Sequence, residues 1–169
     1  DDGDKVTINI DAGGGPTPTP TPTPPPGGGD CDAVVEADFV EFNDDCSVGT
    51  MFGDVTEDYT LTSSVQWRID GAVIVGSGNS TIVESDADVQ AVRDAGVTLT
   101  IEPGTDIRAF DDGSLVVTRG SMIMADATGE ARRPTAEEVI VFTSDKPKGQ
   151  RDRGDWGGLI INGMAQTNA

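Results

Sequence analysis

Two charged side chains, Asp106 and Arg108, stand two positions apart in a short segment that alternates polar and apolar residues. In a β-strand this spacing places both side chains on one face. With Asp111 and Asp112 just downstream, the carboxylates could hold a Ca²⁺ ion against an acidic sugar, while Arg108 or the later Arg119 abstracts a proton. The sequence favours a simpler interpretation, a solvated ion pair on an outward face.

Clustered oxygen ligands indicate a second kind of chemistry, the binding of a hard cation. Asn43, Asp44 and Asp45 are consecutive, and Asp111 and Asp112 precede a glycine in a predicted turn. Carboxylates and amides are ligands that Ca²⁺ prefers. Neither run matches the loop pattern of a helix-loop-helix calcium site, so acidity that serves solubility is the alternative. Apart from Ca²⁺ at these runs, the sequence predicts no cofactor.

The two cysteines, Cys31 and Cys46, enclose a short acidic segment. An even cysteine count beside a proline-threonine tract is typical of an exported protein with one disulfide. Closing such a loop contributes about 3 kcal/mol in the chain-entropy model. Two buried free thiols are the alternative, and a metal pair is disfavoured because no further soft ligand accompanies them. We therefore predict a disulfide-bonded cap.

A ligand surface is predicted near the end of the chain, where basic residues concentrate. Six bases fall within one short stretch: Arg132, Arg133, Lys146, Lys148, Arg151 and Arg153. Trp156 follows them and is flanked by glycines. Its indole either covers the edge of the core or offers a stacking platform for a sugar. The candidate binding residues are therefore Trp156, Arg151 and Arg153.

The overall composition excludes several functions. The 169 residues hold 30 acidic and 11 basic side chains, no histidine, and a formal net charge of −19. Such a charge repels phosphate backbones, which excludes nucleic acid as a partner. Without histidine there is no imidazole base and no histidine zinc site. The apolar runs are far shorter than the ~20 residues of a transmembrane helix, and the first residues do not resemble a signal peptide.

The elements that must position these residues divide the chain into four parts. Residues 1–12 form a tail with a short alternating segment, and residues 13–29 form a glycine-bracketed Thr-Pro linker that favours polyproline II. Residues 30–57 are the acidic, disulfide-bonded cap. Its apolar residues are expected to cover one end of the core: Val34, Val35, Phe39, Val40 and Phe42. Residues 58–169 are long enough for one domain.

Residues 58–169 are rich in short apolar segments that are typical of β-strands. Five of them begin at intervals of 18 to 25 residues: 72–76, 97–101, 115–118, 139–143 and 159–162. Four weaker segments lie among them: 60–62, 65–69, 106–110 and 121–125. This repetition, with two or three strands per repeat, favours a parallel β-solenoid. An antiparallel sandwich is the alternative all-β fold, because Asp111-Asp112-Gly113 would suit a hairpin.

One helix is predicted on the flank of the solenoid. Ser85 followed by Asp88 is a variant of the capping box, and Val89 and Val92 share one face. Gly96 is a C-terminal stop signal. The helix is expected to run over residues 86–95 as a short insertion.

Four motifs in the second half of the chain resemble those of a protein family. They are VTLTIEPGTDIRAF at 97–110, LVVTRGSMIMADAT at 115–128, VIVFTSDKP at 139–147 and RGDWGGLIINGMA at 153–165. Their order and content resemble secreted and outer-membrane lipoproteins of Gram-negative bacteria. The resemblance implies an all-β, right-handed parallel β-helix, secreted or at the outer-membrane surface, with rungs beyond residue 169. The loop that contains Arg132, Arg133 and Pro134 departs from the family pattern.

Together these features predict a secreted or cell-surface β-helix with a binding or structural role. The expected partners are a surface glycan or a protein, or a second copy that joins through exposed strand edges at the end of the solenoid. Parallel β-helices often act on acidic polysaccharides, so a polysaccharide lyase or hydrolase is the alternative. Because the net charge opposes a polyanionic substrate, the sequence favours a protein that is not an enzyme.

Overall fold

A computed structural model describes residues 34–129 and 132–164, so the N-terminal tail, the Thr-Pro linker and Cys31 lie outside the described residues. The described part contains strands β1 to β12, helix α1 (Asp86–Asp94) and a short 3-10 helix (Gly78–Ser80). The strands are β1 (Val40–Phe42), β2 (Val48–Met51), β3 (Asp54–Val55), β4 (Tyr59–Leu61), β5 (Gln66–Ile69), β6 (Ala72–Val75), β7 (Thr98–Ile101), β8 (Asp106–Ala109), β9 (Ser114–Val117), β10 (Met122–Ala125), β11 (Val141–Ser144) and β12 (Gly158–Ile161).

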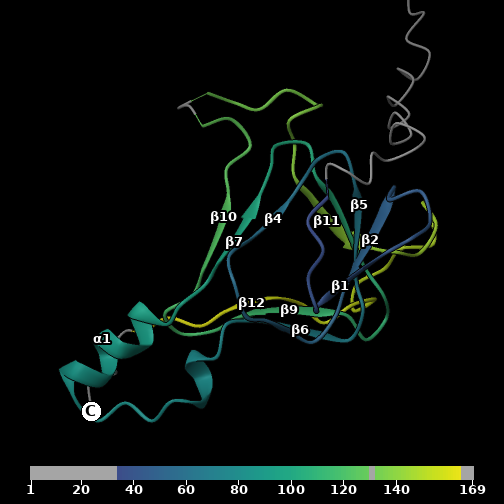
Figure 1. Cartoon of the computed structure of the whole chain (residues 1–169). Helices are drawn as coiled ribbons and strands as arrows, with labels where there is room; N and C mark the ends of the chain where they lie inside the picture. Colours follow the sequence, from purple (N-terminus) through teal and green to yellow (C-terminus); the bar gives the residue numbers. More distant parts are fainter. Residues whose placement is uncertain (1–33, 130–131, 165–169) are drawn as a thin grey trace, which may run out of the picture.

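The strands form three sheets, and each turn of the chain contributes one strand to each sheet in succession. Sheet A has the order β1-β2-β5-β8-β11, sheet B the order β3-β6-β9-β12, and sheet C the order β4-β7-β10. Strand β1 pairs with β2 in antiparallel fashion, and the other pairs are parallel. Seen along the stack, the sheets form three sides of a triangle (Figure 1). This arrangement is a parallel β-helix.

The core lies between the three sheets, and its side chains repeat at the same strand position in successive rungs. Every second residue of β5, β7, β8 and β9 is buried. One inward ladder of sheet A runs through Gly49, Trp67, Ile107 and Phe142. The Trp67 side chain is 1% exposed, and a Cβ added at Gly49 would come within 2.7 Å of its ring. Glycine at position 49 therefore makes room for the largest residue of the core.

An insertion interrupts the second rung between β6 and β7. It holds the 3-10 helix and α1, and it projects from the corner between sheets B and C (Figure 1). The Asp88 N–H donates to the Ser85 hydroxyl at 3.3 Å, and the Ser85 N–H donates to the Asp88 carboxylate at 2.9 Å. The predicted capping box is confirmed. Helix α1 packs through the buried Val92 and ends at Asp94, one residue before the predicted end.

The parallel ladders contradict the antiparallel sandwich. Asp111-Asp112-Gly113 joins β8 in sheet A to β9 in sheet B, so this turn is a corner of a rung and not a hairpin. The predicted strand segments correspond to β4 through β12. The interval of 18 to 25 residues is not the length of a rung, however. The strongest segments belong to different sheets, because β6, β9 and β12 stack in sheet B whereas β7 lies in sheet C and β11 in sheet A.

The segment assigned to the cap differs from the prediction in two respects. Strands β2 and β3 already pair in parallel with β5 and β6, so the stack begins at Val48, inside residues 30–57. Phe39 and Val40 are buried, as a cover for the core requires, but Val35 is 69% exposed and contributes little to it. Cys46 is buried. Its predicted partner lies outside the described residues, and the disulfide stays a prediction.

The outer strands β10, β11 and β12 each have an edge that no strand of the described residues pairs with. Large apolar side chains are exposed on these strands: Met122, Met124, Val141, Leu159, Ile160 and Ile161. They would suit the predicted assembly between copies, which stays a prediction. Within the described ranges, no helix has the length and hydropathy needed to span a bilayer.

Candidate ligand-binding face of sheet A

The outer face of sheet A carries a strip of polar side chains. Outward positions on β5, β8 and β11 hold Gln66, Arg68, Asp106, Arg108 and Thr143. The strand register places Arg68 beside Arg108 and Arg108 beside Thr143. Neighbouring strands lie about 4.8 Å apart, so the two arginines occupy successive rungs of one surface. We call these five residues, together with Asp145, the arginine strip.

Arg108 is held in a fixed orientation by two neighbours. Its Nη2 and Nε donate to Oδ2 of Asp106 at 2.7 and 3.1 Å. With the Gln66 amide turned so that its oxygen faces Arg108, this oxygen accepts from Nε at 2.7 Å and from Nη1 at 2.9 Å. The predicted ion pair between Asp106 and Arg108 is confirmed. A guanidinium that is braced in this way keeps its remaining N–H groups aimed in one direction.

Arg68 is bound more loosely than Arg108. Its Nε lies 3.5 Å from Oδ1 of Asp145, and its guanidinium lies over the ring of Phe110, 5.8 Å from the ring centre. This buried Nε has no hydrogen-bond partner among the described residues. Since a guanidinium has five N–H donors, Arg68 keeps donors open for an anionic ligand.

A loop of residues 145–157 follows β11 and meets the arginine strip at Asp145. In this loop Lys146 Nζ lies 2.7 Å from Oδ1 of Asp155 and 3.6 Å from Oδ1 of Asp111. Asp155 is 8% exposed and also accepts from the Asp152 N–H at 2.7 Å. The hydrogen bond between Lys146 and Asp155 raises the pKa of Lys146 and lowers the pKa of Asp155. Both groups are charged at neutral pH, and their pair anchors the loop.

The three predicted binding residues all lie on this loop. Arg151 and Arg153 are exposed. The Nε of Arg151 donates to the carbonyl of Lys146 at 2.7 Å, which holds this guanidinium near the anchor. Trp156 is half-buried and packs against the core, as the covering interpretation predicts. A sugar-stacking role for its ring stays a prediction.

The predicted Ca²⁺ ligands fall into two separate turns. Between β1 and β2, Asn43 accepts a backbone N–H at 2.9 Å, and Asp45 accepts the hydroxyl and N–H of Ser47 at 2.6 and 3.1 Å. The bond from the Ser47 hydroxyl is the main reason that the pKa of Asp45 is lowered. Asp111 and Asp112 are exposed at a corner of the third rung. The described residues contain no group of three acidic, histidine or cysteine side chains that could hold a metal ion.

The structure separates Arg119 from the other candidates for chemistry. Its Nη2 donates to the carbonyls of Asn79 at 3.3 Å and Thr81 at 2.6 Å, both in the insertion. Arg119 therefore holds the insertion and is not an alternative to Arg108 on sheet A. Arg68 takes that place. The sequence contains a signal for it, because arginine is the third residue of both QWRI in β5 and DIRA in β8.

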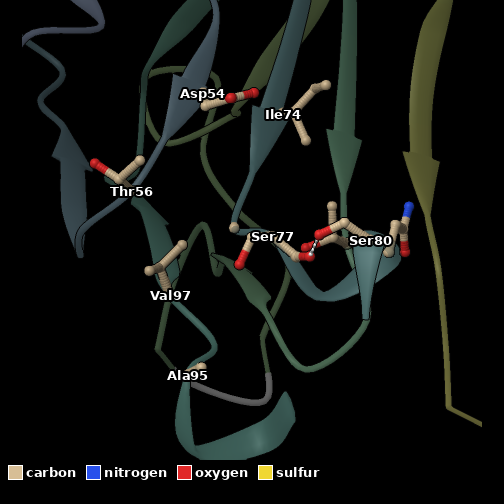
Figure 2. A pocket seen from close by; sticks show the side chains of 10 residues that line it. Asp54, Thr56, Ile74, Ser77, Ser80, Ala95 and Val97 are labelled. Atoms are coloured by element: carbon tan, nitrogen blue, oxygen red, sulfur yellow. Dashed lines mark hydrogen bonds between the residues drawn. The ribbon is translucent and has the colours of Figure 1, made fainter. Parts of the chain in front are cut away.

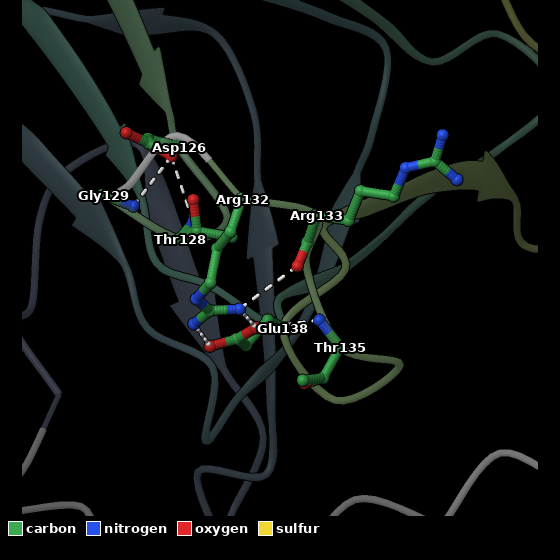
Figure 3. A network of polar contacts seen from close by, with 7 residues as sticks. All are labelled: Asp126, Thr128, Gly129, Arg132, Arg133, Thr135 and Glu138. Carbon is green, nitrogen blue, oxygen red and sulfur yellow. Dashed lines mark hydrogen bonds and ion pairs between the residues drawn. The ribbon is translucent and has the colours of Figure 1, made fainter.

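Arg132 and Glu138 form an ion pair in the loop between β10 and β11 (Figure 3). Nη1 and Nη2 of Arg132 donate to the Glu138 carboxylate at 2.8 and 2.6 Å, and the Thr135 N–H donates to it at 2.8 Å. The hydrogen bonds from Arg132 and then from Thr135 lower the pKa of Glu138 from 4.5 to about 2. The enlarged loop noted in the sequence is thus tied at Glu138.

We expect the Glu138 carboxylate to titrate with a midpoint near 2. Because its pKa in the folded protein lies below the unfolded value, the pair stabilises the loop above about pH 4.5, and this contribution is lost as the pH falls toward 2. In Arg132→Gln the midpoint should rise toward 4.5. A ¹³C NMR titration of the carboxylate measures both values. A midpoint of 4.5 in the unmodified protein would show that the pair does not form.

Comparison with known proteins identifies the same fold as the strand ladders do. No curated protein and no solved structure matches the chain. The model of one protein family matches residues 53–169, and this family is described as a pectate-lyase like beta helix domain. The match begins at the corner before β3 and includes every later strand. The chain therefore belongs to the family of pectate-lyase-like β-helix domains.

Proposed function

We propose that this β-helix is an extracellular binding module that captures an acidic glycan on the outer face of sheet A. The observation that carries the proposal is the pair Arg68 and Arg108, stacked on neighbouring strands of an otherwise acidic chain. Guanidinium groups bind carboxylates through two parallel hydrogen bonds. A glycan with a carboxylate on successive sugars would find one such group on each of two rungs.

The local charge of the strip supports an anionic ligand. Asp106 and Asp145 balance the two arginines, so this face has no excess of negative charge although the chain as a whole carries −19. Arg151 and Arg153 on the loop after β11 add two exposed cations next to the strip. An acidic glycan therefore meets less repulsion here than at the acidic segment before β4.

The proposed location is the exterior of a Gram-negative bacterium, either secreted or at the outer-membrane surface. The resemblance of the four motifs and the cysteine pair beside a Thr-Pro linker support it. A linker of this composition is extended, at about 3.1 Å per residue, and would hold the β-helix away from whatever precedes it. This geometry suits a module that captures glycans.

The proposal predicts that Arg68→Gln and Arg108→Gln each weaken binding of oligogalacturonate about tenfold, because each removes a charge-assisted hydrogen bond to a carboxylate. Isothermal titration calorimetry of the full chain measures the affinity. The methyl-esterified oligomer, which has the same sugars without the charge, should bind weakly to all variants.

Arg133→Gln is the matched control, since Arg133 is an exposed arginine on the loop before β11 and lies outside the strip. Its affinity should equal that of the unmodified protein. Equal losses in the Arg133 and Arg68 variants would mean that only net charge matters. Equal affinity for the charged and esterified oligomers would also contradict the proposal.

A polysaccharide lyase is the second candidate, and two observations favour it. The family is described as pectate-lyase-like, and Asp106 shares one exposed face with Arg68 and Arg108. In that case a carboxylate and an arginine would act on the bound sugar, the arginine as the base. Incubation with pectate and Ca²⁺ distinguishes the two. A rise in absorbance from unsaturated sugar ends would establish the lyase, whereas binding without such a rise supports the binding module.

A further inference from the structure

A second cavity lies away from sheet A, where the insertion meets the outer side of sheet B. Its volume is about 350 Å³, at the lower end of the ~300–1,000 Å³ that ligand pockets occupy. Asp54 and Thr56 line it from β3 and the turn after it, Ile74 from β6, and Ser77 and Val97 from the two ends of the insertion (Figure 2). The cavity exists because the insertion lengthens this corner of the second rung.

The wall that the insertion contributes is fixed in place. Gly78 packs so closely that an added Cβ would overlap the carbonyl oxygen of Arg119. The Gly78 N–H donates to the Thr118 hydroxyl at 3.2 Å. Arg119 in turn holds Asn79 and Thr81 through their carbonyls. The cavity is therefore preformed, and a ligand need not order the insertion in order to bind.

The chemistry of the lining selects a cation. Asp54 is the one charged side chain among the residues that line the cavity, and its exposed carboxylate has no ion pair or hydrogen bond within the described residues. The hydroxyls of Thr56 and Ser77 likewise have no partner in that part of the chain. Ile74 and Val97 supply an apolar wall. Arg119 is the neighbouring base, and its guanidinium is already bound to the insertion.

We propose that this cavity binds a small molecule that carries a protonated amine, of the size of an amino sugar. The ammonium group would pair with Asp54, and hydroxyls of the ligand would bond to Thr56 and Ser77. The carbon skeleton would lie against Ile74. An acid is excluded by the lone carboxylate, and a neutral sugar would leave that charge unpaired.

The test compares D-glucosamine with D-glucose, which differ only in the amine, by NMR titration of the full chain. Glucosamine should shift the amide signals of Thr56, Ser77 and Val97 and bind at least tenfold more tightly than glucose. In Asp54→Asn, which keeps the shape of the side chain, this preference should disappear. Glu57→Gln is the matched control, because Glu57 is an exposed acid of the same turn that does not line the cavity. It should keep the preference.

Two results would overturn the proposal: equal affinity for the two sugars, or an equal loss in the Asp54 and Glu57 variants. Absence of glucosamine shifts at Thr56, Ser77 and Val97 would overturn it as well. The readout is independent of the arginine strip, since oligogalacturonate is expected to shift Arg68 and Arg108 on sheet A instead. Failure of either site thus leaves the other testable.

Discussion

Replacing Trp67 by alanine is expected to lower the free energy of unfolding by about 3–5 kcal/mol, the usual loss for a large aromatic residue in a core. The side chain is 1% exposed, and its Nε1 donates to the carbonyl of Thr62 at 2.9 Å. Its ring meets the rings of Phe42 and Tyr59 edge to face, at centre distances of 5.8 and 5.9 Å. Chemical denaturation followed by circular dichroism measures the loss.

The second tryptophan provides the control for this substitution. Trp156 is half-buried at the edge of the core, so Trp156→Ala should cost less, about 1–2 kcal/mol. Equal effects of the two substitutions would mean that Trp67 does not fill the centre of the stack. The burial that makes Trp67 costly to remove also raises the pKa of the neighbouring Tyr59 to about 12. Its hydroxyl donates to the carbonyl of Val35 at 2.6 Å.

Gly78→Ala is expected to detach the insertion from the stack and to destabilise the protein by about 1–3 kcal/mol, the range for overpacking a close contact. The new methyl group would overlap the backbone carbonyl of Arg119, which cannot move without breaking the turn between β9 and β10. Amide hydrogen exchange should accelerate over residues 77–96, while the ladder of sheet A keeps its protection. Hydrogen exchange read by mass spectrometry measures this difference.

Gly163→Ala is the matched control for the glycine substitution. A Cβ at Gly163 meets no atom within 4 Å, so the same chemical change should leave both stability and exchange unaltered. If Gly78→Ala exchanged as slowly as the unmodified protein over residues 77–96, the close packing of the insertion would be wrong. The preformed wall of the second cavity would then lose its basis.

The strands of residues 58–169 could be predicted because alternation of apolar residues is a local property. Assigning them to sheets could not, since all three sheets face one core and give the same alternation, and register is set by packing. Strand β2 escaped detection for a physical reason. Its inward position is Gly49, where space for Trp67 replaces the apolar side chain that a strand pattern requires.

The candidate site was predictable to the same extent. Asp106 and Arg108 belong to one strand, so their shared face follows from the two-residue period. Arg68 joins them only through the pairing of β5 with β8, which is a long-range contact. Arg119 was misassigned because its partners are backbone carbonyls of the insertion, and a carbonyl leaves no trace in the residue types of a sequence.

The corner between sheets B and C passes through very different lengths of chain at each level. Residues 56–58 make the connection in the first rung, residues 76–97 in the second and residues 118–121 in the third. The strands on both sides stay in register throughout, with Val73 opposite Leu115 and Leu99 opposite Ile123. This corner is therefore a natural grafting position, at which a foreign peptide could replace the insertion while the sheets keep their pairing.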